Sequence, residues 1–103
     1  MDGMNKFGYE FEEDDLFLEQ LKKIGNIKHV DDALEILSNA LSKNPEQFEI
    51  YAKPNLRIAK TKAYFRDGIY IPPLRVFFII KETEKCNIVN LKYIETIEYD
   101  FDS

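Results

Sequence analysis

The sequence predicts an α+β fold in which a two-helix hairpin packs on one face of an antiparallel or mixed β-sheet. Two observations carry this prediction. Two helical patterns occupy the first half of the chain, whereas stretches rich in β-branched and aromatic residues dominate after residue 48. A short strand pattern precedes the first helix, so the predicted order is β-α-α-β-β-β. The 103 residues fit one domain, residues 1–103, with a single core.

The first strand is predicted over residues 6–12. Phe7, Tyr9 and Phe11 alternate there with Gly and Glu residues, which is the period of a half-buried strand. The first helix is predicted over residues 14–24, because leucine and other apolar residues recur on one helical face, acids lie at its start, and Gly25 follows as a terminator.

The second helix has the clearest pattern in the chain. Its apolar residues fall at three- and four-residue steps, namely Val30, Ala33, Leu34, Leu37, Ala40 and Leu41. The pattern ends at Asn44-Pro45, because proline lacks an N–H and disfavours a helical residue before it. We expect the connection over residues 26–29 to fold the two helices into a hairpin.

Three further strands are predicted, over residues 56–65, 74–81 and 87–94, from their β-branched and aromatic content. Asp67-Gly68 is a turn signal between the first two of them. The strand over 74–81 begins after Pro72-Pro73, because proline cannot lie in the middle of a sheet. A polar stretch over residues 81–85 then suits an antiparallel hairpin.

The composition excludes several classes of function. A formal net charge of −5 argues against indiscriminate nucleic-acid binding, and there is no glycine-rich phosphate loop and no Cys/His zinc spacing. His29 is the only histidine and Cys86 the only cysteine, so we predict no histidine triad, no disulfide, no metal and no cofactor. No apolar run approaches a membrane span and the start lacks a signal-peptide pattern, so the sequence predicts a cytoplasmic protein with no membrane contact.

A cationic stretch is the most informative local feature. Half of the fourteen basic residues lie between Lys53 and Lys81, against one acid, Asp67. They are Lys53, Arg57, Lys60, Lys62, Arg66, Arg75 and Lys81. On an otherwise acidic chain, this stretch is a candidate anion site. The alternative is a solvated sheet face whose cations pair with the abundant Asp and Glu residues.

Side-chain alternation places these cations on faces of the predicted sheet. In the strand over 74–81, the apolar row that should meet the helices is Leu74, Val76, Phe78 and Ile80. Arg75, Phe77, Ile79 and Lys81 then lie on the opposite, open face. Lys60 and Lys62 join Arg75 there if Ala59, Thr61 and Ala63 face the helices, in which case Leu56 and Ile58 also point outward unless a bulge intervenes. Arg57 falls on the other face.

Three segments, DALEILSNALSKNPEQF, LRIAKTKAYF and PPLRVFFII, together with the order of elements resemble the RelE/ParE superfamily of bacterial toxins. The resemblance spans nearly the whole chain and implies a RelE-like fold. Its most specific pieces are the helix that ends in an Asn-Pro turn and the arginine of PLRVFF, which is similar to the Arg-Val-aromatic strand of the family.

The resemblance implies a toxin of a type II toxin–antitoxin system. In the RelE branch, such toxins are metal-independent endoribonucleases that cut messenger RNA on the ribosome, by attack of a ribose 2′-hydroxyl on the adjacent phosphate, and so inhibit translation. The implied partners are a cognate antitoxin, the ribosome and messenger RNA, in a homodimer or a toxin–antitoxin hetero-oligomer. A cation held against the phosphate would stabilise the charge that develops during attack.

The resemblance assigns roles residue by residue. Arg75 matches the arginine that stabilises the phosphate or transition state, Lys60 and Lys62 match phosphate-binding or base positions, and Tyr99 matches a terminal tyrosine with Tyr93 as a neighbouring substitute. The implied catalytic residues are Arg75, Lys60, Lys62 and Tyr99. The implied RNA-binding residues are Arg57, Lys60, Lys62, Arg66, Arg75, Lys81 and Tyr93.

The carboxy-terminal part departs from the family pattern. Many relatives carry a His-Arg pair four residues before the tyrosine, whereas here, in KYIETIEYD, Ile94 and Glu95 occupy that pair. Two alternatives to an endoribonuclease therefore stay open. One is a non-catalytic binding module that uses the exposed Phe77, Ile79 and Ile58 for a protein partner. The other is a gyrase inhibitor of the ParE branch, which shares the fold without the catalytic set.

Overall fold

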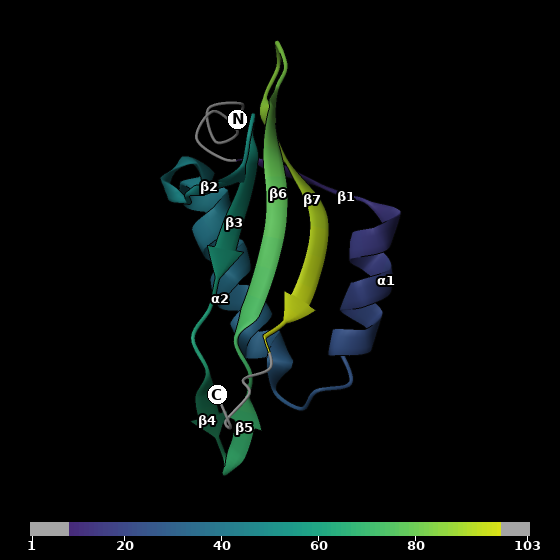
Figure 1. Ribbon diagram of the computed structural model, residues 1–103, viewed down its shortest axis with the longest axis vertical. Coiled ribbons are helices and arrows are strands. Elements are labelled where there is room, and N and C mark those ends of the chain that lie inside the picture. The colour runs from purple at the N-terminus through teal and green to yellow at the C-terminus, as the bar shows by residue number, and fades with distance from the viewer. Residues whose placement is uncertain (1–8, 98–103) are drawn as a thin grey trace, which may run out of the picture.

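Two helices and seven strands follow one another along the chain in a computed structural model that describes residues 9–97 (Figure 1). In chain order the elements are β1 (Glu10–Glu13), α1 (Asp15–Ile24), α2 (Val30–Lys43), the short 3₁₀ helix η2 (Pro45–Gln47), β2 (Ile50–Ala52), β3 (Leu56–Lys60), β4 (Tyr64–Arg66), β5 (Ile69–Ile71), β6 (Leu74–Glu82) and β7 (Asn87–Thr96). No helix within residues 9–97 is long and apolar enough to cross a membrane.

The main sheet is mixed and contains five strands in the order β1-β7-β6-β3-β2. Strand β1 is parallel to β7, and the other neighbouring pairs are antiparallel. Strands β4 and β5 form a separate two-stranded sheet that projects from the end of β3 and β6, and Figure 1 shows α2 crossing behind β3 and β6 while α1 runs beside β7. The predicted α+β class with two helices and a mixed sheet is confirmed.

The core lies between the two helices and one face of the main sheet. From the helices it takes Phe17, Ile24, Val30, Ala33, Leu37 and Leu41, and from the rest of the chain Ala59, Ile71, Leu74, Val76, Phe78, Val89, Leu91 and Ile94. In β6, Leu74, Val76 and Phe78 are buried while the residues between them stay half-exposed. The predicted alternation of β6 is therefore confirmed, and Arg75 lies on the open face, opposite the helices.

A bulge in β7 decides which of its residues share that open face. Phe77 pairs with Tyr93 but Phe78 pairs with Leu91, so Lys92 is an extra residue in the ladder. The extra residue shifts by one position which side chains of β7 face the helices. As a result, Tyr93 and Glu95 lie on the open face and Ile94 lies in the core.

Two predicted strands differ markedly from the observed ones, whereas β6 and β7 only extend one and two residues beyond the predicted 74–81 and 87–94. Strand β1 covers Glu10–Glu13 rather than residues 6–12, of which residues 6–8 lie outside the described part of the chain. The single strand expected over residues 56–65 is wrong, because it is divided into β3 and β4. Thr61 ends the ladder: its N–H donates to Leu74 O (3.0 Å), and its Oγ1 accepts from Leu74 N (2.8 Å). The prolines opposite, at positions 72 and 73, have no N–H to continue it.

The β4–β5 hairpin, residues 64–71, forms an arm beyond the main sheet. Its two-residue turn is Asp67-Gly68, with φ of 53° and 79°, as the sequence predicted. Two contacts tie the arm to the start of α2: an ion pair between Arg66 and Asp32, and a 3.4 Å contact between His29 Nε2 and Asp67 Oδ2.

Candidate binding surface

Lys60 and Arg75 lie directly opposite each other on the open face of the sheet. They are cross-strand partners in β3 and β6, so their side chains leave the sheet on the same side. This is the register that the sequence suggested for Lys60. Lys62 behaves differently, because β3 ends at Lys60 and Lys62 follows in the irregular stretch before β4.

Arg75 is engaged by a carboxylate. Its Nη2 forms an ion pair with Glu95 Oε2, and Glu95 is its cross-strand partner in β7. The Nε atom of Arg75 is buried without a hydrogen-bond partner in the structure. The charge of this guanidinium is therefore balanced within the sheet by the carboxylate of Glu95.

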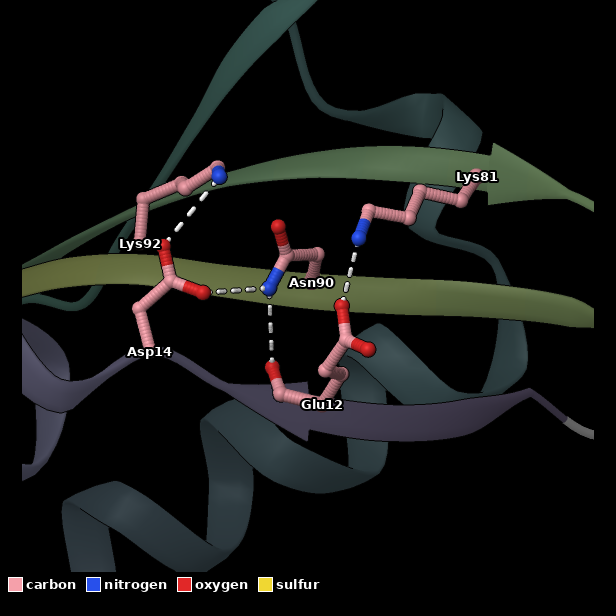
Figure 2. Close-up of polar contacts among 5 residues, drawn as sticks. All are labelled: Glu12, Asp14, Lys81, Asn90 and Lys92. Carbon is pink, nitrogen blue, oxygen red and sulfur yellow. Dashed lines mark hydrogen bonds and ion pairs between the residues drawn. The ribbon is translucent and has the colours of Figure 1, made fainter.

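Where β1 pairs with β7, the open face holds a polar cluster centred on Asn90 (Figure 2). Asn90 is fully buried, and its Nδ2 donates to Glu12 O (3.3 Å) and to Asp14 Oδ1 (3.0 Å). Lys81 pairs with Glu12 (2.7 Å) and Lys92 with Asp14 (3.1 Å). The hydrogen bond from Asn90, and after it the bond from Lys92, lowers the pKa of the Asp14 carboxyl below its ordinary value.

An aromatic row crosses the centre of the open face. The rings of Tyr51 and Phe77 meet edge to face with centroids 5.0 Å apart, and those of Phe77 and Tyr93 are 6.1 Å apart. Because β3 lies between β2 and β6, Tyr51 reaches across it, which explains why Ile58 is 5% exposed although it faces away from the helices. Gln20 Nε2 of α1 donates to Tyr93 Oη (2.9 Å).

The other candidate residues are dispersed. Arg57 pairs with Phe78, so it faces the helix side as predicted, and its Nη1 donates to Glu46 O (3.0 Å) and Phe48 O (2.6 Å). Arg66 lies on the arm and pairs with Asp32. Tyr99 lies outside the described residues. Of the four predicted catalytic residues, the described structure therefore places only Lys60 and Arg75 directly opposite each other.

Sequence reasoning missed two residues of this surface, Tyr51 and Asn90. Tyr51 lies in β2, which is too short to leave a periodic pattern. Asn90 did leave a signal, since it is a single amide in the apolar run IVNLKYI, and a polar residue in such a run is either satisfied by neighbours or functional. Within residues 9–97, no group of three His, Cys, Asp or Glu side chains is arranged to hold a metal ion.

No family model, curated protein or solved structure matches this chain.

Proposed function

We propose that this chain is a non-catalytic binding module of the RelE/ParE type, and that it docks a cognate protein partner on the open face of its sheet. The ion pair between Arg75 and Glu95 is the observation that supports this most directly. An arginine already held by a carboxylate has less capacity to stabilise charge on a scissile phosphate, because that phosphate must compete with Glu95 for the guanidinium.

The arrangement of the open face also fits a protein partner. Its centre is formed by three aromatic residues, Phe77, Tyr93 and Tyr51. The side chain of Tyr51 is 60% exposed. Charged pairs surround this centre, at Lys81 with Glu12, Lys92 with Asp14 and Arg75 with Glu95. An aromatic centre inside a charged rim of both signs is typical of protein–protein interfaces, where a few buried aromatic residues carry most of the binding free energy.

A RelE-like endoribonuclease is the second candidate, and the position of Lys60 opposite Arg75 favours it. Two cations on one face could hold a phosphate between them if Glu95 released the arginine. In this case Glu95→Gln, which removes the competing charge, would increase cleavage of messenger RNA, whereas Arg75→Ala would abolish it.

Controlled expression of four chains separates the two candidates: wild type, Glu95→Gln, Arg75→Ala and Phe77→Ala/Ile79→Ala. Growth and primer extension on an abundant messenger RNA report cleavage, and affinity capture from the native host reports a partner. The proposal predicts intact message in all four chains and a partner that the Phe77/Ile79 variant no longer retains. Phe65→Ala/Tyr70→Ala, which removes two exposed aromatic residues from the arm, is the matched control and should retain the partner.

Cleavage by the wild type that Arg75→Ala abolishes would overturn the proposal in favour of the ribonuclease. Equal capture of the partner by the wild type and the Phe77/Ile79 variant would also contradict it, because the partner would then bind elsewhere.

A further inference from the structure

The outer edge of β3 is covered only in part. Strand β2 pairs with Leu56 and Arg57, and the N–H of Ile58 donates to Glu49 O (3.1 Å). Peptide groups alternate in direction along a strand, and the N–H of Thr61 points toward β6. The N–H and C=O of Lys60 therefore point outward, where none of the described strands lies beside them. This short edge is available for pairing with an added strand.

A groove runs beside that edge, between α2 and the stretch that follows β3. Its volume is about 440 Å³, and it is lined by Ala33, Ile36, Leu37, Ala40, Phe48, Lys60, Thr61, Lys62, Ala63 and Tyr64. Ile36 lies on the exposed face of α2 and is 62% exposed, although its side chain is apolar. Most of the side chains that line the groove are apolar, and the hydroxyl of Tyr64, one of the lining residues, is buried without a hydrogen-bond partner in the structure.

The charges at the groove are not balanced by neighbouring residues. Lys60 and Lys62 are exposed, and no carboxylate within residues 9–97 forms an ion pair with either. Of the other basic residues in the two sheets, Arg66, Arg75, Lys81 and Lys92 each pair with an Asp or Glu, and Arg57 donates to two main-chain oxygens. A ligand for this edge gains most if it brings its own negative charge.

We propose that the outer edge of β3 and the adjoining groove bind an extended acidic segment of a partner protein by strand addition. Alternate side chains of an added strand point to opposite faces. On the helix side an apolar side chain would enter the groove beside Ile36 and Tyr64. On the open side the next side chain would meet Lys60, and a carboxylate there forms a charge-assisted hydrogen bond. The preferred ligand alternates apolar and acidic residues.

This site lies at the edge of the sheet, apart from the aromatic row, and goes beyond the partner proposed for the open face. Lysines at a free strand edge also have a purely protective use, because they discourage pairing with other chains. The two roles differ in one measurable way: protection predicts no binding of any extended peptide, whereas the proposed site discriminates peptides by charge.

The test is fluorescence anisotropy with a labelled synthetic peptide of about eight residues that alternates Glu with Phe and Leu. The wild type should bind it, more weakly as salt rises, and should bind neither a version with Lys in place of Glu nor one with Pro at alternate positions. Lys60→Ala/Lys62→Ala should weaken binding about tenfold or more, since the peptide loses its charge-assisted hydrogen bond to Lys60 and the attraction of Lys62 at the groove. Lys22→Ala/Lys23→Ala, two exposed lysines at the end of α1, is the matched control and should bind as the wild type.

Equal binding by the wild type and the Lys60/Lys62 variant, or no binding at all by the wild type, would overturn the proposal. The chain itself carries an alternating acidic and aromatic sequence over residues 98–102, so a chain that ends at residue 97 is measured in parallel. Binding by the shortened chain alone would assign the groove to this chain rather than to a partner, and would also overturn it. The Phe77→Ala/Ile79→Ala variant should bind the peptide as the wild type does. A failure of the partner site on the open face can therefore be distinguished from a failure of the peptide site at the edge of β3.

Discussion

At the scale of single residues, Asn90 links three parts of the fold. It is the one polar residue within residues 9–97 whose side chain is fully buried. Both of its Nδ2 hydrogens are donated, one to the backbone of β1 and one to the carboxylate that precedes α1. Asp14 is also the N-cap of α1. One amide thus fixes where β1 ends and where α1 begins, and its Oδ1 stays without a partner in the structure.

Replacing Asn90 by Ala should lower the free energy of unfolding by about 1–3 kcal/mol, because two hydrogen bonds are lost at a buried position. Urea unfolding followed by circular dichroism measures this. Asn39→Ala, at an exposed position of α2, is the control and should change stability by less than about 0.5 kcal/mol. A similar loss in both variants would mean that the bonds of Asn90 contribute little.

The lowered pKa of Asp14 gives stability a dependence on pH. The pKa of this carboxyl in the folded chain lies below its value in the unfolded chain, owing first to the Asn90 bond and then to Lys92. Its ionised form therefore stabilises the fold above the unfolded value, near pH 4, and this contribution is lost as the pH falls through the folded value.

Asp14→Asn should flatten this dependence, since an amide does not titrate. The measurement is the urea midpoint of the wild type and the variant between about pH 2 and pH 7. Asp15→Asn is the matched control, because it removes a carboxylate one position along without removing a bond to Asn90 or Lys92. Parallel curves for Asp14→Asn and the wild type would show that Asp14 carries no such effect.

At the scale of elements, the arm depends on a turn that few residues can adopt. Asp67 and Gly68 both have positive φ, which matches the twist of the flanking strands, and aspartate and glycine are among the residues that tolerate it. Outside the turn, the arm exposes the rings of Phe65 and Tyr70, which contact each other at a tilt of 60°, and is tied to α2 by Arg66.

Gly68→Ala should destabilise the arm by about 1 kcal/mol, and the origin of the effect is conformational, because a Cβ at Gly68 would meet no atom within 4 Å. Faster amide hydrogen exchange in residues 64–71, with the rest of the sheet unchanged, is the expected readout. Gly25→Ala is the control: Gly25 has φ of −60° and its added Cβ approaches only main-chain oxygens, at 3.4 Å or more, so exchange in the arm should not change.

The sequence predicted long periodic elements and missed short ones, for physical reasons. Helix α2 and strand β6 span several periods of burial, so their faces could be read directly. Strands β2 and β5 contain three residues each, and their existence depends on pairing with distant segments. The bulge at Lys92 likewise depends on the pairing of β7 with β6. The local sequence therefore did not predict that Tyr93 and Glu95 would share a face with Arg75.

The same distinction applies to the candidate site. The open-face position of Arg75 followed from alternation and is confirmed, as is the helix-side position of Arg57. The ion pair of Arg75 with Glu95 could not be foreseen, because it needs the register of β6 against β7. Alternation also failed at Lys62, since Thr61 and the two prolines end the strand before it.

At the scale of the whole molecule, the stability of the chain depends on the layer between the helices and the sheet. Phe78 lies at the centre of that layer, is fully buried and meets Phe48 edge to face with centroids 6.0 Å apart. The open face adds only a shallow second cluster around Ile58. A domain of this size has one dominant core, so disruption of that layer should unfold the chain as a unit.

Phe78→Ala should therefore lower the free energy of unfolding by about 3–5 kcal/mol, a large part of the total for a small domain. Phe65→Ala, which truncates a side chain that is 70% exposed, should change it by less than about 0.5 kcal/mol. Denaturant titration of both variants beside the wild type checks the contrast. Comparable losses in the two would mean that the arm belongs to the same cooperative unit.

The parallel pairing of β1 with β7 has a consequence for the order of events during synthesis. Glu10 is held opposite Ile88 and Glu13 opposite Leu91, so the first described strand finds its partner only when the last one exists. A nascent chain can form α1 and α2 early, since their hydrogen bonds are local, but their apolar faces stay uncovered until β6 and β7 leave the ribosome. Folding should thus be completed only once β7 has left the ribosome, with the helices as a transient, aggregation-prone intermediate.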